Sequence, residues 1–308
     1  MSQENRRGIL WALAAAAGIA GFIIPWKMAS SYGANTATNA LVLLCAAAVF
    51  NSLLLIVRQR AVPRFNRLDL AVAAGLGAFT LLGNLASALS IQLISPALMT
   101  VVQRGEVVVI ALLAWPILGE RIDRKFWLGV AIAAGGLLLL HDPATSGEST
   151  AVGIAWAGAA TLCFGAMAVI TRKFIHQIDP VSVNALRLWL SVAFWFGWNG
   201  VPPELFEITA PQAGYATLAA FFGPFLGRLS MMMSAKYVEA RITTLTTLAA
   251  PPLALVLGYV VLSDLPTARE IQGGVIMMVG ISIPILSLAR SRPETVADPA
   301  APSRSGER

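Results

Sequence analysis

The chain has 308 residues, of which 57% are hydrophobic and 12% are charged, and its mean hydropathy is +0.72. A soluble domain carries about 25% charged residues, so this composition excludes a soluble globular protein. The net charge of +6 does not indicate a nucleic-acid-binding face, because the basic residues gather at the ends of apolar runs and mark membrane topology.

A membrane-spanning helix needs about 20 mainly apolar residues to cross roughly 30 Å of hydrocarbon. Ten such runs, separated by charged residues or by Pro and Gly, follow one another along the chain. We place them at 9–31, 37–57, 68–89, 96–118, 126–141, 152–171, 183–200, 214–235, 242–262 and 270–289. The sequence therefore predicts an all-α membrane protein with ten transmembrane helices.

The distribution of Lys and Arg between the loops predicts how these helices are oriented. Only Lys27 and Arg269 fall on one side of the membrane. Fifteen basic residues fall on the other side: Arg6, Arg7, Arg58, Arg60, Arg64, Arg67, Arg121, Arg124, Lys125, Arg172, Lys173, Lys236, Arg241, Arg290 and Arg292. Since cytoplasmic loops carry the excess of basic residues, we expect both termini in the cytoplasm, in the inner or plasma membrane.

The two halves of the chain repeat each other. Near the start of each half, Gly8, Ile9, Trp11 and Ala12 align with Gly153, Ile154, Trp156 and Ala157 at an offset of 145. Further along, at an offset of 144, Ser90 aligns with Ser234, Gly129 with Gly273 and Gly136 with Gly280. We expect one five-helix repeat at 1–143, a second at 153–290, and a disordered cytoplasmic tail at 291–308.

An odd number of spans in each repeat has a structural consequence. Five crossings leave the second copy to start on the opposite side, so the two repeats are inverted, as in many secondary transporters. The first span, whose counterpart lies in mid-chain, is then a retained helix and not a signal peptide.

A motif at the end of the first half carries a family resemblance. It runs from Pro96–Met99 through Glu106-Val107 to Leu118–Arg121, and continues with Leu128-Gly129 and Gly135-Gly136. This pattern resembles the EamA family of the drug/metabolite transporter superfamily. The resemblance implies ten helices in two inverted five-helix repeats, a cavity between them, and export or uptake of small metabolites.

The second copy departs from this motif at two points. Ala250-Pro251 stands where the first half has Glu106-Val107, and Ser263-Asp264 replaces Gly119-Glu120. The acidic residue at the midpoint of the span is therefore present in one half only.

Ionisable residues within the spans are the candidates for substrate binding or coupling, because a charge at the bilayer centre costs about 2.5–3.5 kcal/mol on insertion scales. Glu106 lies about 15 Å into its span, with Arg104 and Gln103 beside it. Arg228 lies within another span, and Asn84 holds the equivalent position in the first half.

Three roles stay open for these residues. Arg104 and Arg228 would bind a carboxylate or another anion if both face a cavity. Glu106 would carry a proton if burial raises its pKa. The pair Arg104 and Glu106 would otherwise be a structural lock within the bundle.

Two further residues within the spans, Arg187 and Pro224, concern the structure of the bundle. Arg187 falls near the cytoplasmic start of its span, where we expect its long side chain to reach the interface. Pro224 removes a backbone hydrogen bond in mid-span, which indicates either a hinge beside a cavity or an ordinary structural kink.

These observations predict a secondary active transporter that moves a small metabolite or drug-like solute by alternating access. A channel or a non-transporting membrane sensor is the alternative. An intramembrane enzyme is not expected, because the two His and two Cys are scattered along the chain. We expect no cofactor, no metal ion and no nucleic acid, and as partners a small-molecule substrate and the lipid bilayer, with the chain a monomer or a homodimer.

Overall fold

The computed structural model describes residues 3–32, 36–59, 65–93, 99, 102–103, 105–119, 124–139, 149–247, 249–262, 268, 271–276, 278–280 and 283. Over these residues the chain forms helices joined by turns and short loops, and no strand occurs among them. The predicted all-α fold class is confirmed. The predicted tail at 291–308 lies outside the described residues.

The helices of the first half are α1 (Gln3–Tyr32), α2 (Thr36–Gln59), α3 (Arg67–Leu93), α5 (Glu106–Leu118) and α6 (Arg124–Leu139). The second half contains α7 (Ser149–Phe174), α8 (Pro180–Asn199), η2 (Pro203–Glu207), α9 (Ala210–Ala220), η3 (Phe221–Gly227), α10 (Arg228–Ser234), α11 (Ala240–Thr247) and α12 (Ala250–Leu262). A further short apolar helix covers Ile271–Gly280.

Each of the ten predicted spans coincides with helix in the described part of the chain. Five of these helices are long and apolar enough to cross a membrane by themselves, and two shorter apolar helices accompany them. The eighth span is a composite of α9, η3 and α10, and the ninth is divided between α11 and α12.

Local sequence signals determine where several helices begin and end. Asp179 caps α8 by accepting hydrogen bonds from the Ser182 amide and hydroxyl at 2.9 and 2.8 Å, and Pro180 occupies the first turn. Thr209 caps α9 in a similar way. Gly119 ends α5 with a φ of 69°, a left-handed conformation that glycine adopts without steric cost.

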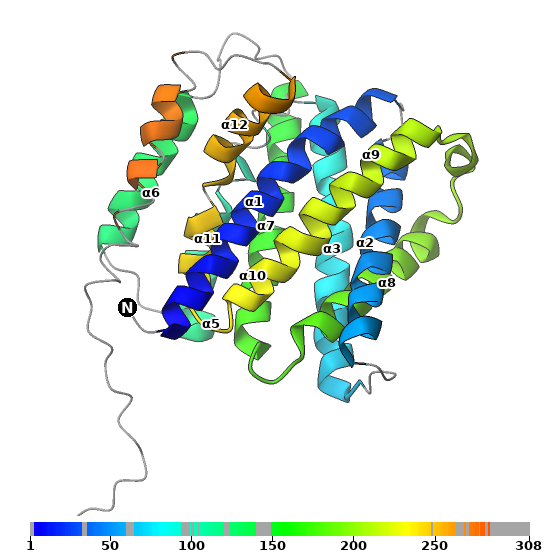
Figure 1. Cartoon of the computed structure of the whole chain (residues 1–308), viewed down its shortest axis with the longest axis horizontal. Helices are drawn as coiled ribbons and strands as arrows, with labels where there is room; N and C mark the ends of the chain where they lie inside the picture. Colours follow the sequence, from blue (N-terminus) through cyan, green and yellow to red (C-terminus); the bar gives the residue numbers. More distant parts are fainter. Residues whose placement is uncertain are drawn as a thin grey trace, which may run out of the picture.

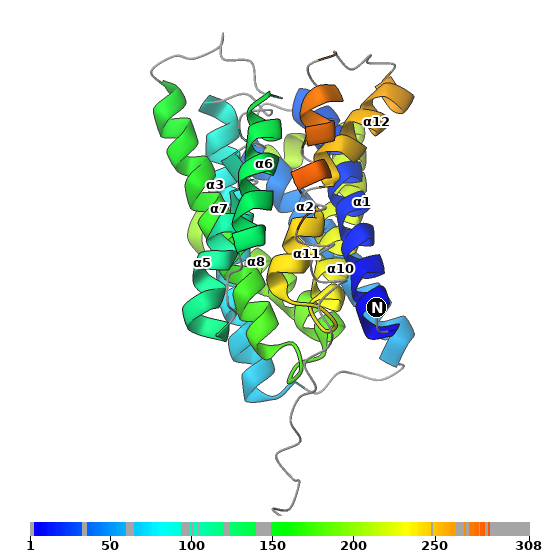
Figure 2. The same cartoon turned by 90° about the vertical axis from the view of Figure 1, so that its left-hand side faces the viewer.

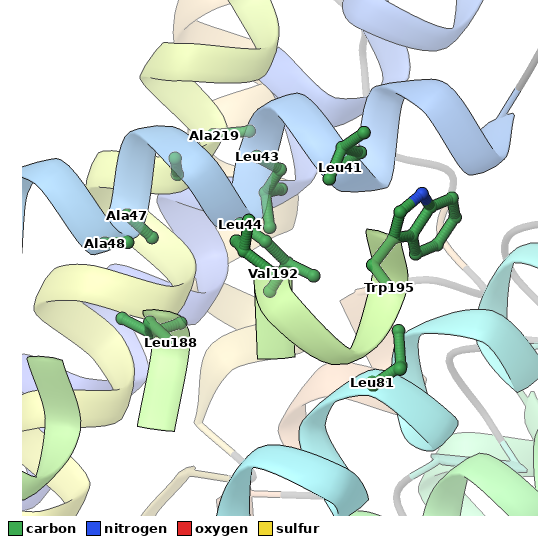
Figure 3. Close-up of a cluster of buried hydrophobic side chains, with 11 residues drawn as sticks. Leu41, Leu43, Leu44, Ala47, Ala48, Leu81, Leu188, Val192, Trp195 and Ala219 are labelled. Carbon is green, nitrogen blue, oxygen red and sulfur yellow. The ribbon is translucent and has the colours of Figure 1, made fainter. Parts of the chain in front are cut away.

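The largest core cluster among the described residues lies between α2, α3, α8 and α9 (Figure 3). Leucines of α2 pack there against Leu188, Val192 and Trp195 of α8, with Ala219 of α9 and Leu81 of α3 alongside. Small residues such as Ala47 and Ala48 let the helices approach closely, as expected where lipid removes the hydrophobic drive and association depends on tight packing.

The sequence repeat reappears as a pair of equivalent contacts exchanged between the halves. Ser90 of α3 donates a hydrogen bond to the Gly153 carbonyl of α7 at 2.9 Å. Its aligned partner Ser234 of α10 donates to the Gly8 carbonyl of α1 at 2.8 Å. Gly8 and Gly153 are themselves an aligned pair. The two contacts are therefore one interaction made twice, with the donor and acceptor halves exchanged.

The directions of the helices show that the repeats are inverted. Thr80 contacts Met167 and Ser90 contacts Gly153, so residue numbers fall along α7 as they rise along α3, and these two helices are antiparallel. Because α2 returns the chain between α1 and α3, α1 runs parallel to α3. Counterparts α1 and α7 therefore run in opposite directions.

The packing of the whole bundle follows the same symmetry. α3, α5 and α7 gather on one side in Figure 2, and their counterparts α10, α12 and α1 gather on the other. Figure 1 shows α1 beside the run of α9 and α10, which is the counterpart of α3 beside α7. Gly280 lies against Gly129 and Ala133 of α6, so glycines predicted by their spacing mediate contact between the last helices of the two halves.

The contact between α1 and the end of η3 depends on the absence of a side chain at Gly18. A Cβ there would lie 2.8 Å from Gly227 Cα and 2.8 Å from the Phe222 carbonyl oxygen, both backbone atoms. We expect Gly18→Ala to lower the free energy of unfolding by about 1–3 kcal/mol, because the helices must separate. Thermal unfolding in detergent measures this change.

Gly75→Ala is the matched control for that substitution. Gly75 also lies inside a helix, but a Cβ at this position would meet no atom within 4 Å. Alanine should therefore be neutral or stabilising at Gly75, since it favours the helix by about 1 kcal/mol over glycine. Equal effects of the two substitutions would mean that close contact at Gly18 contributes nothing.

Candidate functional site

The fourth and ninth spans are interrupted at aligned positions. In the fourth, the Gly105 amide donates to the Val102 carbonyl at 2.9 Å, and α5 begins at the next residue. In the ninth, the Ala249 amide donates to the Thr246 carbonyl at 3.1 Å, and α12 begins at Ala250. Both bonds replace the α-helical spacing of four residues with three. A short tight turn in mid-helix often marks a functional hinge.

Glu106 is the first residue of α5, directly after this interruption. The side chain is half-buried and lies where the positive end of the helix dipole favours a carboxylate. Thr161 of α7 lies beside the interruption: its hydroxyl donates to the Ala157 carbonyl of its own helix at 2.7 Å and lies 3.4 Å from the Val102 carbonyl. The aligned start of α12 has Ala250, which is packed among alanines of α1. Both halves therefore have the interruption, but only the first half has a charged residue directly after it.

Arg228 follows a second departure from α-helical geometry. Residues Phe221–Gly227 form a π-helix that contains Pro224, and the Arg228 amide donates to the Gly223 carbonyl five residues back. Proline has no amide hydrogen and its ring crowds the preceding turn, which explains why the helix widens here. Pro224 thus lies within a π-helical segment, and this segment determines how Arg228, the first residue of α10, is oriented.

The Arg228 side chain points towards α7 of its own half. Its guanidinium carbon lies 5.5 Å from the centre of the Phe164 ring on α7, within the range of a cation–π contact. One of its nitrogens lies 3.8 Å from the Met231 sulfur, a weak acceptor. Glu106 is close enough to Arg228 for an attractive electrostatic interaction. The arginine and the glutamate, predicted as candidates, are thereby brought into one region.

Arg187 does not reach the interface, and the sequence-based prediction for it was wrong. The side chain is 2% exposed and lies about 10 Å along α8 from Pro180. Its Nε donates to the Asn184 carboxamide oxygen at 2.7 Å, and its Nη1 donates to the Thr80 hydroxyl at 2.7 Å. Two neutral acceptors inside the bundle hold the guanidinium, which is the reason it does not extend towards water.

A buried polar network surrounds Arg187 and joins α2, α3 and α8. Asn184 also donates to the Asn51 side chain of α2 at 2.5 Å. Ser191 donates to the Gly77 carbonyl of α3 at 2.9 Å. Sequence reasoning missed this network, although Asn184, Arg187 and Ser191 form a polar face at helical spacing within an apolar span.

Two predicted candidates have partners close to their own positions. Asn84 donates to the Thr80 carbonyl of its own helix at 2.7 Å. Gln103 donates to the Ser87 hydroxyl of α3 at 3.0 Å. Within the described residues, neither Asn84 nor Gln103 forms a hydrogen bond with Arg228 or Arg187. Arg104, the remaining candidate, lies outside the described residues.

The two arginines of this region, Arg187 and Arg228, form no ion pair with a carboxylate of the described residues. Over the part of the chain that the structure describes, no carboxylate oxygen lies within 4.0 Å of Arg187 or Arg228. The two arginines are close enough for mutual repulsion. We define Arg187, Arg228 and Glu106 as the charged cluster. With all three ionised, these side chains carry a net charge of +1.

The fold and this cluster define a class of protein: a multi-pass helical membrane protein built from two inverted repeats, with charged residues at their junction. The chain belongs to the EamA-like transporter family, whose model matches residues 6–141 and 151–286. The match in two consecutive segments confirms the two-repeat architecture. It also confirms the family resemblance of the sequence, and with it a transporter of the drug/metabolite type in general.

Comparison with solved structures supports the fold alone. One chain, described as "Crystal structure of protein", superposes with a TM-score of 0.71 at 18% sequence identity. The similarity covers 92% of this chain and 98% of that chain. Among curated proteins, none matches the sequence.

Proposed function

We propose that this chain is a secondary active transporter that moves a small metabolite or drug-like solute across the inner or plasma membrane by alternating access. The observation that carries the proposal is the exchanged pair of contacts, Ser90 to Gly153 and Ser234 to Gly8. Two inverted halves joined by equivalent contacts can exchange conformations, so states open to either side of the membrane have similar energies.

The interruptions in the fourth and ninth spans support the same proposal. They fall at aligned positions in the two halves, as do the broken helices that bind substrates in inverted-repeat transporters. One interruption leads directly into Glu106, and Arg228 approaches it from the other half. The substrate site is then at this junction, with Gln103, Asn84 and Arg104 as further candidates. Both termini face the cytoplasm, and the working unit is a monomer or a homodimer.

A counterflow experiment tests the transport function. Liposomes containing the purified protein are loaded with amino acids, nucleosides and organic anions, and exchange against an isotope-labelled copy of this mixture is followed over a range of concentrations. We expect saturable exchange of at least one component, absent from protein-free liposomes. Flux that rises without saturation would identify a channel, and no flux of any component would contradict the proposal.

A further inference from the structure

The charges at the junction indicate which class of solute it accepts. This inference rests on the transport function proposed above. Arg187 is a cation 2% exposed and held by two uncharged acceptors, the Thr80 hydroxyl and the Asn184 carboxamide. These bonds orient the guanidinium but leave its charge uncompensated. A buried cation without a nearby anion is strongly unfavourable. Its presence in an apolar span therefore calls for a counter-charge from elsewhere.

Arg228 adds a second positive charge, so the need for a counter-charge is greater. Its guanidinium is also a group that a solute could bind. Its side chain is half-buried, whereas that of Arg187 is fully buried, so Arg228 is the more exposed of the two cations. Over the described residues its guanidinium meets only the Phe164 ring and the Met231 sulfur. A guanidinium has five N–H donors, and neither neighbour is a strong acceptor. The described residues therefore leave most of its donors without a strong acceptor.

The surroundings of Arg228 suit a planar anionic group. Phe164 holds the guanidinium at its ring, and the edges that carry the N–H donors can then form two parallel hydrogen bonds to a carboxylate or phosphate. Glu106 attracts Arg228 at longer range, and the charged cluster as defined keeps one excess positive charge. One anionic group on the solute would compensate this charge and bring the charged cluster to neutrality.

We propose that the transported solute is an organic anion and that Arg228 binds its carboxylate or phosphate group. Arg187 is a positioning residue: it does not touch the solute, and its buried positive charge adds to the positive potential at Arg228. A solute with a positive charge would instead meet two cations and a single carboxylate. The cluster therefore selects against cations as well as in favour of anions.

Thermal unfolding of the purified full-length protein with defined probes tests this proposal. The anionic probes are benzoate, succinate and inorganic phosphate, and the matched uncharged or cationic probes are benzamide, succinamide and benzylamine. We expect at least one anion to raise the unfolding temperature in a saturable manner, and its amide or amine counterpart to have no effect. Stabilisation by the amides or the amine alone, or by no anion, would overturn the proposal.

Variants then locate the binding group. Arg228→Gln should abolish the anion response, and Arg228→Lys, which keeps the charge without the planar fork, should retain a response at least tenfold weaker in apparent affinity. Arg67→Gln removes the same charge from an exposed position at the start of α3 and should respond like the wild type. An undiminished response in Arg228→Gln would overturn the assignment. The wild-type comparison of anions with amides decides the solute class even if this variant does not fold.

The two proposals can fail separately. Saturable counterflow of an uncharged or cationic solute, without anion binding, would remove the anion site and leave the transporter intact. Anion binding that depends on Arg228, combined with no counterflow of the same anion, would keep the site and remove the transport function.

Discussion

Replacing Thr80 with valine is expected to lower the free energy of unfolding by about 2–3 kcal/mol. Valine has nearly the same shape as threonine, but it cannot accept the 2.7 Å hydrogen bond from Arg187. The guanidinium is then left buried with one fewer acceptor, and its desolvation is no longer offset. Chemical or thermal unfolding in detergent measures the loss, and Thr80→Ser, which keeps the hydroxyl, should lose clearly less.

A double-mutant cycle shows whether the loss comes from Arg187. In an Arg187→Met background, the buried charge is gone, and apolar replacements of buried ions are often neutral or stabilising. Thr80→Val should then change the free energy of unfolding by less than about 1 kcal/mol. An equal loss in both backgrounds would show that Thr80 stabilises the bundle without acting on Arg187. Arg187→Met should fold and yet lose the anion response, which separates stability from function.

The second large effect is expected at Glu106. Glu106→Gln removes the carboxylate that attracts Arg228, while Arg187 still repels that residue. We expect the unliganded protein to lose about 1–3 kcal/mol of unfolding free energy, and Arg228→Gln to recover much of this loss in the double variant. Unfolding of the two single variants and of the double variant measures the interaction between these residues.

Anion binding should change in the opposite direction in Glu106→Gln. The carboxylate of Glu106 and an anionic solute compete for the same positive potential, so its removal should tighten anion binding by about tenfold, or 1.4 kcal/mol. Glu106→Asp, which keeps the charge, is the control and should bind anions about as the wild type does. Weaker anion binding in Glu106→Gln would mean that Glu106 assists the anion and does not compete with it.

Much of the fold could be predicted from the sequence because the bilayer imposes simple rules. A helix must be long and apolar to cross it, and each of the ten predicted spans contains helix. The spacing of Ser90, Ser234 and the aligned glycines predicted the repeat, since these positions mediate close helix contacts that leave little choice of residue. The family match over two segments confirms this prediction.

The candidate site was predicted only in part, because the decisive features depend on tertiary contacts. Glu106 and Arg228 stood out as charges in apolar spans, but the sequence does not show that these two residues interact electrostatically. Arg187 was wrongly assigned to the interface, since distance along a helix does not reveal acceptors on neighbouring helices. Thr80 and Asn184 hold it in the interior.

The departures from regular α-helix could not be predicted from the sequence either. Pro224 predicted a disturbance, but not a π-helix that places Arg228 after it. The interruption before Glu106 has no proline, and glycine alone at 105 is common within transmembrane helices. Its alignment with the interruption at Ala249 becomes visible only when the hydrogen bonds of both spans are compared.

The opposite orientation of the two repeats is the claim on which the transport mechanism depends, and site-specific labelling tests it most directly. Single cysteines are placed at Arg67 and Ala210, exposed positions that open the third helix of each repeat, after Cys45 and Cys163 are replaced by alanine. A membrane-impermeant maleimide is applied to intact cells and to inverted vesicles. We expect Ala210→Cys to react only from outside and Arg67→Cys only from the cytoplasmic face. Reaction of both cysteines from the same face would contradict the inverted repeat.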